Sequence, residues 1–251
     1  MKIVIQILVV AFMLSTLRAA EKDTRCFELR TYYAATGKLD ELHARFRNHT
    51  MKLFEKHGIS NIGYWVPAEN AKSKLIYLLA YPSRDAREKS WKEFMEDPDW
   101  KAAYKASEEK GRLVVEIEAV FLTATDYSPA IAPSTSTEPR AFELRTYKAP
   151  SGKLANLNAR FRDHTVALFS KHGMTQFGYW VPSEEKSGAD DTLIYLLAHK
   201  SRAAAAASFD AFRTDPAWTK AKSESEKDGP LTVKDGVKSV FLVPTDYSPS
   251  K

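Results

Sequence analysis

A glutamate and an arginine stand two positions apart in a segment that the sequence contains twice, and their types and spacing could support chemistry. In the first copy they are Glu28 and Arg30, followed by Tyr32. Residues two apart on a β-strand point to the same side, so this pair can form a salt bridge. The arginine could instead hold a ligand carboxylate through two parallel hydrogen bonds, but we predict the salt bridge as the state without ligand. The second copy supplies Glu143, Arg145 and Tyr147.

Four tyrosines on further predicted strands would stand beside these pairs. They are Tyr64 and Tyr77 in the first copy and Tyr179 and Tyr195 in the second. Aromatic rings around a few polar groups are typical of a small-molecule pocket. They are also typical of ordinary core packing. The sequence leaves both interpretations open.

Two histidines at matching positions, His49 and His164, are the candidate catalytic residues. Each falls on the apolar stripe expected for the first helix of its copy, with Arg45 largely off that stripe. Imidazole titrates near neutral pH, so either could act as a general base or a haem ligand. Alternatively, each lies at the edge of the core and donates to a backbone carbonyl. The expected stripe comprises Leu39, Leu42, Phe46, His49 and Leu53.

Other kinds of site find no support in the sequence. No second His, Cys or acid shares metal-ligand spacing with His49 or His164, so we predict no metal site. His57 and His172 end helices, where a cation favours the helix dipole, and are predicted to be structural. There is no Gly-rich phosphate loop, no Ser-His-Asp spacing and no Cys-x-x-Cys motif. The single cysteine, Cys26, excludes an intramolecular disulfide.

The first twenty residues resemble a secretory signal peptide. Lys2 precedes an apolar run from Ile3 to Leu14, and small residues follow it. The run is too short for a comfortable transmembrane helix, which needs about 20 residues, although a retained anchor is the alternative. Removal of residues 1–20 takes away two basic residues, so the formal net charge falls from +5 to +3. We predict a secreted or periplasmic protein without a membrane span after cleavage. Its basic residues are too dispersed to bind nucleic acid.

The remaining chain is two copies of one module. Residues 27–67 and 142–182 are identical at 27 of 41 positions without a gap, which indicates an internal duplication. We predict a first domain over residues 21–129 and a second over residues 140–251. Residues 130–139, rich in Pro, Ser and Thr, form a semi-rigid linker between them.

Within each copy the residue pattern predicts the element order β-α-β-β-α-β, with the second helical segment broken at Asp-Pro. This is the ferredoxin-like unit, an α+β fold. The helices cover one face of its sheet, and the other face needs a cover as well. The second copy can provide it, so we predict a closed barrel within one monomeric chain of pseudo-twofold symmetry.

The side chains that face the space between the two sheets are the candidate ligand-binding residues. For the first strand two assignments of the faces are open. If Phe27 and Leu29 pack under the helices, as we assume for the predicted site, the alternate residues of the strand face the interior. The predicted lining is Glu28, Arg30, Tyr32, Tyr64 and Tyr77 with their second-copy equivalents Glu143, Arg145, Tyr147, Tyr179 and Tyr195.

Several motifs together resemble the NIPSNAP family. They are Phe-Glu-Leu-Arg-Thr-Tyr, Phe-Arg-x-His-Thr, His-Gly and Gly-Tyr-Trp-Val-Pro, each present in both copies. The resemblance covers almost all of the chain beyond residue 20. It implies the fold of the dimeric α/β-barrel superfamily, whose members include cofactor-free monooxygenases and haem-handling enzymes. It implies no established catalysis, and fold alone does not fix function.

Three hypotheses for function follow. The first is an exported module without established catalysis that binds a small organic ligand or a protein partner. The second is a cofactor-free monooxygenase or a haem-handling enzyme, with His49 or His164 as base or axial ligand. The third is a structural scaffold whose barrel is filled by side chains.

Overall fold

Both halves of the chain contain the predicted order of elements. The structure is a computed structural model that describes residues 22–251, so the predicted signal peptide, residues 1–20, lies outside the described residues. The first half contains β1 (Cys26–Ala34), α1 (Leu39–Arg45), the π-helical turn η1 (Phe46–Thr50), α2 (Met51–Lys56), β2 (Ser60–Pro67), β3 (Lys74–Tyr81), α3 (Arg84–Glu96), α4 (Pro98–Glu108) and β4 (Val114–Ala124). The second half contains β5 (Ala141–Lys148), α5 (Leu154–Arg160), the π-helical turn η2 (Phe161–Thr165), α6 (Val166–Lys171), β6 (Thr175–Pro182), the short 3-10 turn η3 (Glu185–Ser187), β7 (Thr192–His199), α7 (Arg202–Thr214), α8 (Pro216–Ser225) and β8 (Val237–Pro244).

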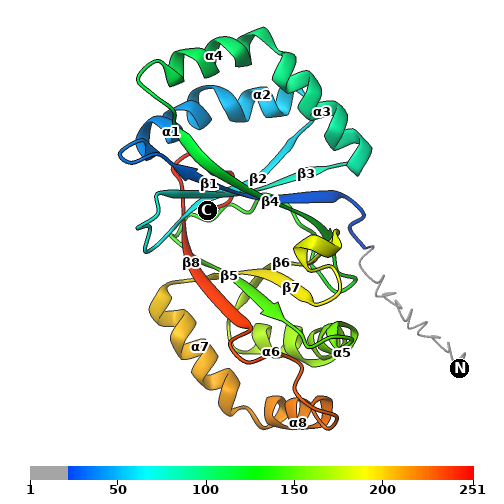
Figure 1. Ribbon diagram of the computed structural model, residues 1–251. Coiled ribbons are helices and arrows are strands. Elements are labelled where there is room, and N and C mark those ends of the chain that lie inside the picture. The colour runs from blue at the N-terminus through cyan, green and yellow to red at the C-terminus, as the bar shows by residue number, and fades with distance from the viewer. Residues whose placement is uncertain (1–21) are drawn as a thin grey trace, which may run out of the picture.

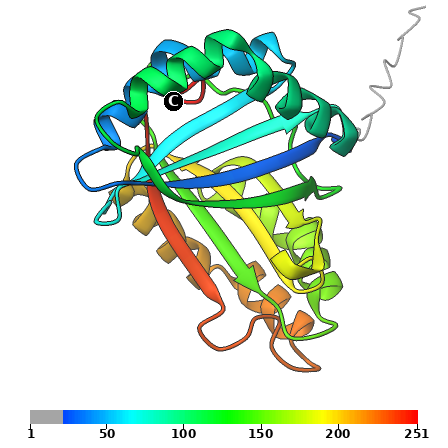
Figure 2. The ribbon, with the colours of Figure 1, turned by 45° about the horizontal axis from the view of Figure 1, so that its top comes forward.

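The two halves stack with their sheets together and their helices on the outer faces (Figure 1). The strands form one closed barrel in the order β1-β3-β2-β8-β5-β7-β6-β4, and β4 returns to β1. All neighbouring strands are antiparallel. Figure 2 shows the strands of one sheet crossing those of the other at an angle. The predicted α+β barrel, built from two repeats in one chain, is confirmed.

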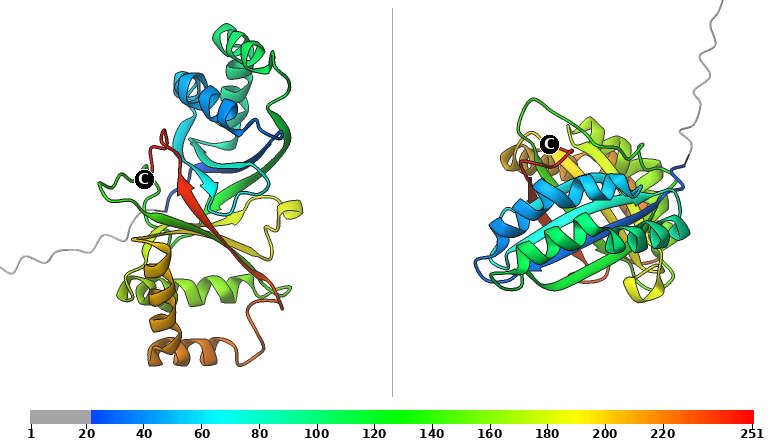
Figure 3. Two further views of the ribbon diagram at one scale, coloured as in Figure 1. Left: turned by 90° about the vertical axis from the view of Figure 1, so that its left-hand side faces the viewer. Right: turned by 90° about the horizontal axis from the view of Figure 1, so that it is seen from above.

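Each half ends by crossing to the other half. The end of β8 pairs with β2 from Trp65↔Pro244 to Pro67↔Leu242, and the end of β4 pairs with β6 from Leu122↔Pro182 to Ala124↔Trp180. In Figure 3, β8 (red) runs from the second half to the first, and the C-terminus follows it. These two short seams close the barrel, since without them each sheet would have free edges.

The repeated pentapeptide Thr-Asp-Tyr-Ser-Pro after each last strand holds the seam. Asp246 accepts two hydrogen bonds of 2.7 Å from Arg47 of η1, and the Tyr247 hydroxyl lies 2.8 Å from Nδ1 of His43. Asp126 accepts from Arg162 of η2 at 2.7 and 2.8 Å in the same way. The arginine of each Phe-Arg-x-His-Thr motif therefore binds the other half of the chain.

The space between the two sheets is filled with apolar side chains. Phe27 and Trp65 from the first half pack there with Phe142 and Trp180 from the second. Leu29 packs against the same cluster. The prediction that Phe27 and Leu29 lie under the helices is therefore wrong, and the faces of the strand are reversed. The barrel is closed by paired strands, so water is excluded from its interior. Apolar side chains fill it because they are the least costly to transfer out of water.

The linker contributes to this core. Residues 130–139 contain no helix or strand. Ile131, however, is buried among the barrel residues, and its carbonyl accepts a hydrogen bond from Arg25. The connection is thus anchored at Ile131, and Ser134 adds hydrogen bonds with Ser250 and Lys251 at the C-terminal end of the chain.

The π-helical turns change which residues the first helix of each half buries. In η1 the Thr50 hydroxyl donates to the Arg45 carbonyl five residues earlier, at 3.2 Å, and in η2 Thr165 repeats this contact to Arg160 at 3.1 Å. A π-turn inserts one residue into the helical repeat. Thr50 therefore occupies the inward position expected for His49, which is exposed.

The break between α3 and α4 is made by Asp97, whose carboxylate caps α4. Its Oδ1 accepts from the backbone N–H of Asp99 at 2.8 Å, and Pro98 is the first helical residue. Its Oδ2 lies 2.7 Å from both Lys56 Nζ and His57 Nε2. Hydrogen bonds from Lys56 and His57 hold the pKa of Asp97 well below its usual range. The second half repeats this cluster with Asp215, Lys171 and His172.

The protonation of Asp97 and Asp215 should be visible in the pH dependence of the free energy of unfolding. A carboxyl whose pKa is lower in the folded than in the unfolded chain stabilises the fold above the unfolded value, about 4, and this contribution is lost as the pH falls toward the folded value. We expect the free energy of unfolding, measured by urea titration, to fall steeply below about pH 4. The double variant Asp97→Asn/Asp215→Asn keeps a capping side chain. It should be less stable at neutral pH and show a flatter acid limb, and an unchanged acid limb would contradict this assignment.

Candidate functional site

The predicted site residues lie on the helix-facing side of their sheets. Glu28, Arg30 and Tyr32 belong to the layer between the first sheet and its helices, where Tyr64 and Tyr77 stack with ring centroids 5.3 Å apart. The prediction that these side chains face the space between the two halves is wrong. The helix side offers partners that the closed interior lacks, and a buried charge requires such partners. The same correction holds for the second-half set, Glu143, Arg145, Tyr147, Tyr179 and Tyr195.

The barrel interior leaves no room for a ligand at its centre. The cavity found there has a volume of only about 10 Å³, and its lining comes from Trp65, Trp180 and aliphatic side chains of both halves. A single water molecule needs about as much space. The predicted central ligand site is therefore replaced by packed side chains.

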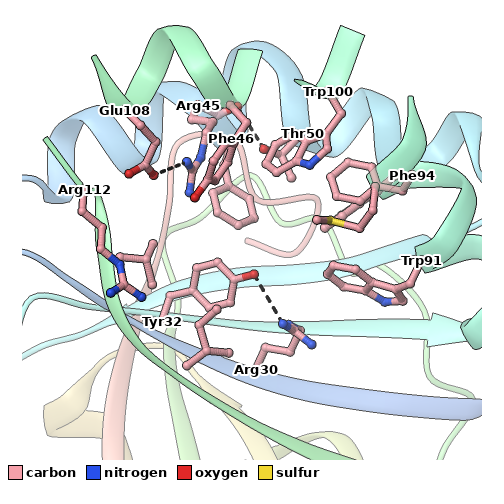
Figure 4. Close-up of a pocket in the computed structure, with 15 residues that line it drawn as sticks. Arg30, Tyr32, Arg45, Phe46, Thr50, Trp91, Phe94, Trp100, Glu108 and Arg112 are labelled. Carbon is pink, nitrogen blue, oxygen red and sulfur yellow. Dashed lines mark hydrogen bonds and ion pairs between the residues drawn. The ribbon is translucent and has the colours of Figure 1, made fainter. Parts of the chain in front are cut away.

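A larger cavity lies in the first half, between the sheet and the helices (Figure 4). Its volume is about 290 Å³. Of the ten predicted ligand-binding residues, only Arg30 and Tyr32 line it. The full lining is Arg30, Tyr32, Arg45, Phe46, Thr50, Phe54, Trp91, Phe94, Met95, Trp100, Tyr104, Glu108, Arg112, Val114 and Ile117.

Arg30 sits in a network that the sequence predicted in part. It donates to Glu28, to the Tyr77 hydroxyl at 3.0 Å and, more weakly, to the Tyr32 hydroxyl at 3.4 Å. Its guanidinium also lies 4.5 Å from the ring centroid of Trp91. The predicted salt bridges Glu28–Arg30 and Glu143–Arg145 are both present.

Glu28 is fully buried and is also bound by a second arginine, which the sequence did not indicate. Arg87 of α3 donates to its two carboxylate oxygens at 2.9 and 3.1 Å, and the Tyr81 hydroxyl donates at 2.9 Å. Burial acts to raise the pKa of Glu28, but the hydrogen bonds of Arg87 and the charge of Arg30 outweigh it and hold the pKa below its usual range. The carboxylate is therefore charged and shared by two arginines.

Arg45 forms another part of the cavity wall. It is only 5% exposed, so its predicted place off the buried stripe is wrong. Its Nη1 donates to Glu108 at 2.8 Å, and Glu108 also accepts from the backbone N–H of Leu113 at 3.1 Å. Its Nε has no hydrogen-bond partner among residues 22–251. A buried donor without a partner costs about 1–3 kcal/mol, so an acceptor that reached this atom would stabilise the site.

The second half keeps the frame of this cavity but not all of its lining. Arg145, Arg160 and Glu226 occupy the positions of Arg30, Arg45 and Glu108, and Arg160 is paired with Glu226 at 2.6 Å. Several other positions differ, among them Ile117, which is Val237 in the second half. Trp91, Met95, Tyr104 and Arg112 are replaced by Phe209, Arg213, Lys222 and Pro230.

The position of Arg87 also differs, because the matching residue of α7 is Ala205. Glu143 instead receives hydrogen bonds from Ser239 and from His199, whose Nε2 lies 3.1 Å from the carboxylate. The two halves thus bind their buried glutamates with different partners. Arg87 and Arg112 were missed by sequence reasoning, although a comparison of the two copies position by position would have singled out both.

The candidate catalytic histidines lie away from the cavity. His49 and His164 are both exposed, and no histidine is among the residues that line the cavity. Within the described part of the chain, no three His, Cys, Asp or Glu side chains are grouped to hold a metal ion. None of the helices between residues 22 and 251 is long and apolar enough to cross a membrane.

Comparisons with known proteins agree with the duplication and the fold. The family model NIPSNAP matches residues 27–129 and again residues 142–249. A curated relative, "Protein NipSnap homolog" of Dictyostelium discoideum, is 25% identical over 142 residues, which make up 56% of this chain and 56% of the relative. The chain therefore aligns with little more than half of that relative.

Two solved structures have similar folds over most of the chain. A putative monooxygenase from Lactobacillus acidophilus matches with a TM-score of 0.56 and 11% identity, covering 88% of this chain and 94% of its own. A putative monooxygenase from Fusobacterium nucleatum matches with a TM-score of 0.59 and 10% identity. The match covers 88% of this chain and 92% of the neighbour's chain. At these identities the likeness concerns the fold alone.

Proposed function

The chain belongs to the NIPSNAP family, and from that premise we propose that its first half binds a small, mostly apolar organic molecule in the cavity between the first sheet and its helices. The observation that carries this proposal is the cavity itself, about 290 Å³ of space walled by aromatic rings and a few polar groups. Ligand pockets have this mixture of many apolar side chains and few polar ones.

The size and lining of the cavity favour a flat ligand of one or two rings. Ligand pockets start at roughly 300 Å³, so this cavity suits a molecule at the small end of the usual range. Phe46, Trp91, Phe94 and Trp100 present ring faces and edges, which pack well against another aromatic system. The hydroxyls of Tyr32 and Thr50 and the arginines can fix its orientation.

Binding fits the lining better than turnover does. The monooxygenase names belong to the structural neighbours, whose likeness is one of fold. In this cavity the one carboxylate, Glu108, already accepts from Arg45 and from the backbone of Leu113. A general base needs a free acceptor within hydrogen-bond reach of the substrate. The haem hypothesis would need a ligand other than His49 or His164 on the cavity wall.

Isothermal titration with the neutral probe 2-naphthamide tests the proposal. For a two-ring ligand, roughly 0.4 kcal/mol per non-hydrogen atom corresponds to a Kd on the order of 0.1–1 mM. Ile117 lies at the exposed rim of the cavity, so Ile117→Trp should fill the opening and weaken binding by about tenfold or more.

The duplication supplies a matched control. Val237 pairs with Tyr147 as Ile117 pairs with Tyr32, and it is exposed to a similar extent. Val237→Trp should leave the Kd unchanged. If both variants weakened binding equally, the site would not lie in the first-half cavity. If neither 2-naphthamide nor its carboxylate analogue 2-naphthoate bound, the proposal would be overturned.

A further inference from the structure

We propose that the ligand of the first-half cavity is an organic acid, a flat apolar body carrying a carboxylate; this inference rests on the proposed function and specifies its ligand class. The observation behind it is an excess of positive charge that the fold leaves uncompensated. Three arginines, Arg30, Arg45 and Arg112, line the cavity, with a single acid, Glu108. Directly behind Arg30, Glu28 is shared with Arg87, which also pairs with the exposed Glu88 at 3.2 Å. One positive charge, that of Arg112, is therefore left without an acid partner in the described chain.

The carboxylates in this layer are already fully engaged. Glu28 accepts from Arg30, Arg87 and Tyr81, and Glu108 accepts from Arg45 and from the Leu113 backbone. Neither has the capacity to neutralise a further cation as well. An anion from outside is therefore the natural partner for the remaining charge, and a partly enclosed site strengthens its attraction.

Two groups are free to receive that anion. The side chain of Arg112 is exposed and has no ion pair or hydrogen bond with any other described residue. The buried Nε of Arg45 likewise lacks a partner within the described chain. Figure 4 shows Arg45, Glu108 and Arg112 toward one side of the cavity, with Trp91 and Phe94 toward the other. A planar guanidinium can hold a carboxylate through two parallel hydrogen bonds, so the acid group belongs at the Arg112 side and the apolar body at the tryptophan side.

The second half contains the corresponding buried ion pairs but lacks two of the arginines of the first half. The positions of Arg87 and Arg112 are Ala205 and Pro230 there. The inner charges that remain, Arg145 and Arg160 with Glu143 and Glu226, balance one another. Arg213 and Lys222 are new cations in this half and are exposed, as Arg112 is in the first, and Arg213 is bound to Asp210 at 2.7 Å. The arginines at positions 87 and 112 therefore distinguish the first half, whereas the second half has an exposed cation at a different position, Lys222.

The test compares 2-naphthoate with 2-naphthamide, two probes of nearly the same shape that differ in charge. By isothermal titration at low salt, the full chain should bind 2-naphthoate about tenfold more tightly than 2-naphthamide. Added sodium chloride should weaken the binding of the acid and leave that of the amide unchanged, since salt screens charge.

Single substitutions test which residues cause the preference for 2-naphthoate over 2-naphthamide. Arg112→Gln should reduce the ratio of the two Kd values to near one, and Arg87→Ala, which installs the residue of the second half, should reduce it in part. Lys110→Gln is the control, because Lys110 is exposed, lies two residues away and does not line the cavity; it should preserve the ratio. Circular dichroism would establish that each variant is folded.

The outcomes separate the two proposals. Equal affinity for both probes in the unmodified chain would overturn the anion preference while leaving ligand binding intact. A preference that persists unchanged in both Arg112→Gln and Arg87→Ala would overturn its assignment to this cavity. Failure of both probes to bind would overturn the proposed function itself.

Discussion

Glu28→Gln is expected to lower the free energy of unfolding by about 3–5 kcal/mol, the cost of removing one partner from a buried ion pair. Glu28 is fully buried and holds both Arg30 and Arg87. A glutamine keeps the shape but leaves the buried Arg30 without a counter-charge and Arg87 with the exposed Glu88 alone. For a chain of this size the melting temperature should fall by roughly 10 °C, measurable by differential scanning calorimetry.

Two further variants show whether the uncompensated charge is the cause. Glu143→Gln should cost less, because Glu143 is shared by one arginine, His199 and Ser239. The double variant Glu28→Gln/Arg87→Ala removes one of the two arginines that shared Glu28 and should recover part of the loss. Equal costs for Glu28→Gln and Glu143→Gln, together with no recovery in the double variant, would contradict this explanation.

Gly63→Ala is expected to be comparably damaging for a steric reason. The indole of Trp65 lies across Gly63, so a Cβ at this position would be 3.0 Å from Cζ3 and still closer to Cη2 and Cζ2. Trp65 is buried in the barrel and cannot swing into solvent. Forcing extra atoms into a packed core costs about 1–3 kcal/mol and occasionally more. We expect a cost at the upper end of this range in urea unfolding.

The neighbouring ring provides the control for this prediction. In the double variant Gly63→Ala/Trp65→Leu the clash disappears, so the alanine should cost much less than it does beside tryptophan. Gly178 and Trp180 form the equivalent contact in the second half, with Ile131 also 3.2 Å from the added Cβ. An alanine that is equally costly with leucine or tryptophan at position 65 would point to the backbone instead of the ring.

Much of the fold followed from pattern alone. The repeat of 27 identical residues in 41 indicated two copies, and the apolar periods and the Asp-Pro cap gave the elements of each. Asp97 and Pro98 stand where the break in the second helical segment was predicted. The closed barrel followed from a further physical step, because a sheet covered by helices on one side needs a cover on the other.

The assignment of faces could not be made in the same way. In β1 both sets of alternate residues include large side chains, Phe27 and Leu29 on one side and Tyr32 on the other, and β3 is apolar on both faces. Alternation tells which residues share a side but not which side is inside the barrel. Only the partners that the fold supplies, such as Arg87 for Glu28, decide that the charged side faces the helices.

The π-turn shows a similar limit at shorter range. A helical stripe drawn with a constant period places His49 inward, but the extra residue in η1 turns Thr50 inward and exposes His49. Arg45, the last residue of α1, is buried just before this turn and becomes part of the cavity wall. A one-residue change in helical repeat leaves no mark in residue type, so the candidate catalytic residues had to be chosen without it.

The sequence by itself determined that this protein is a duplicated α+β module, that each Glu-Arg pair forms a salt bridge, and that it resembles the NIPSNAP family. Only the tertiary structure decided where the cavity lies. Local periodicity specifies which side chains lie together on an element, whereas a cavity depends on which side chains of distant elements fail to fill the gap between them. Arg30, Arg45 and Arg112 come from three separate segments of the first half, and only the packing of its helices on its sheet brings them around one cavity.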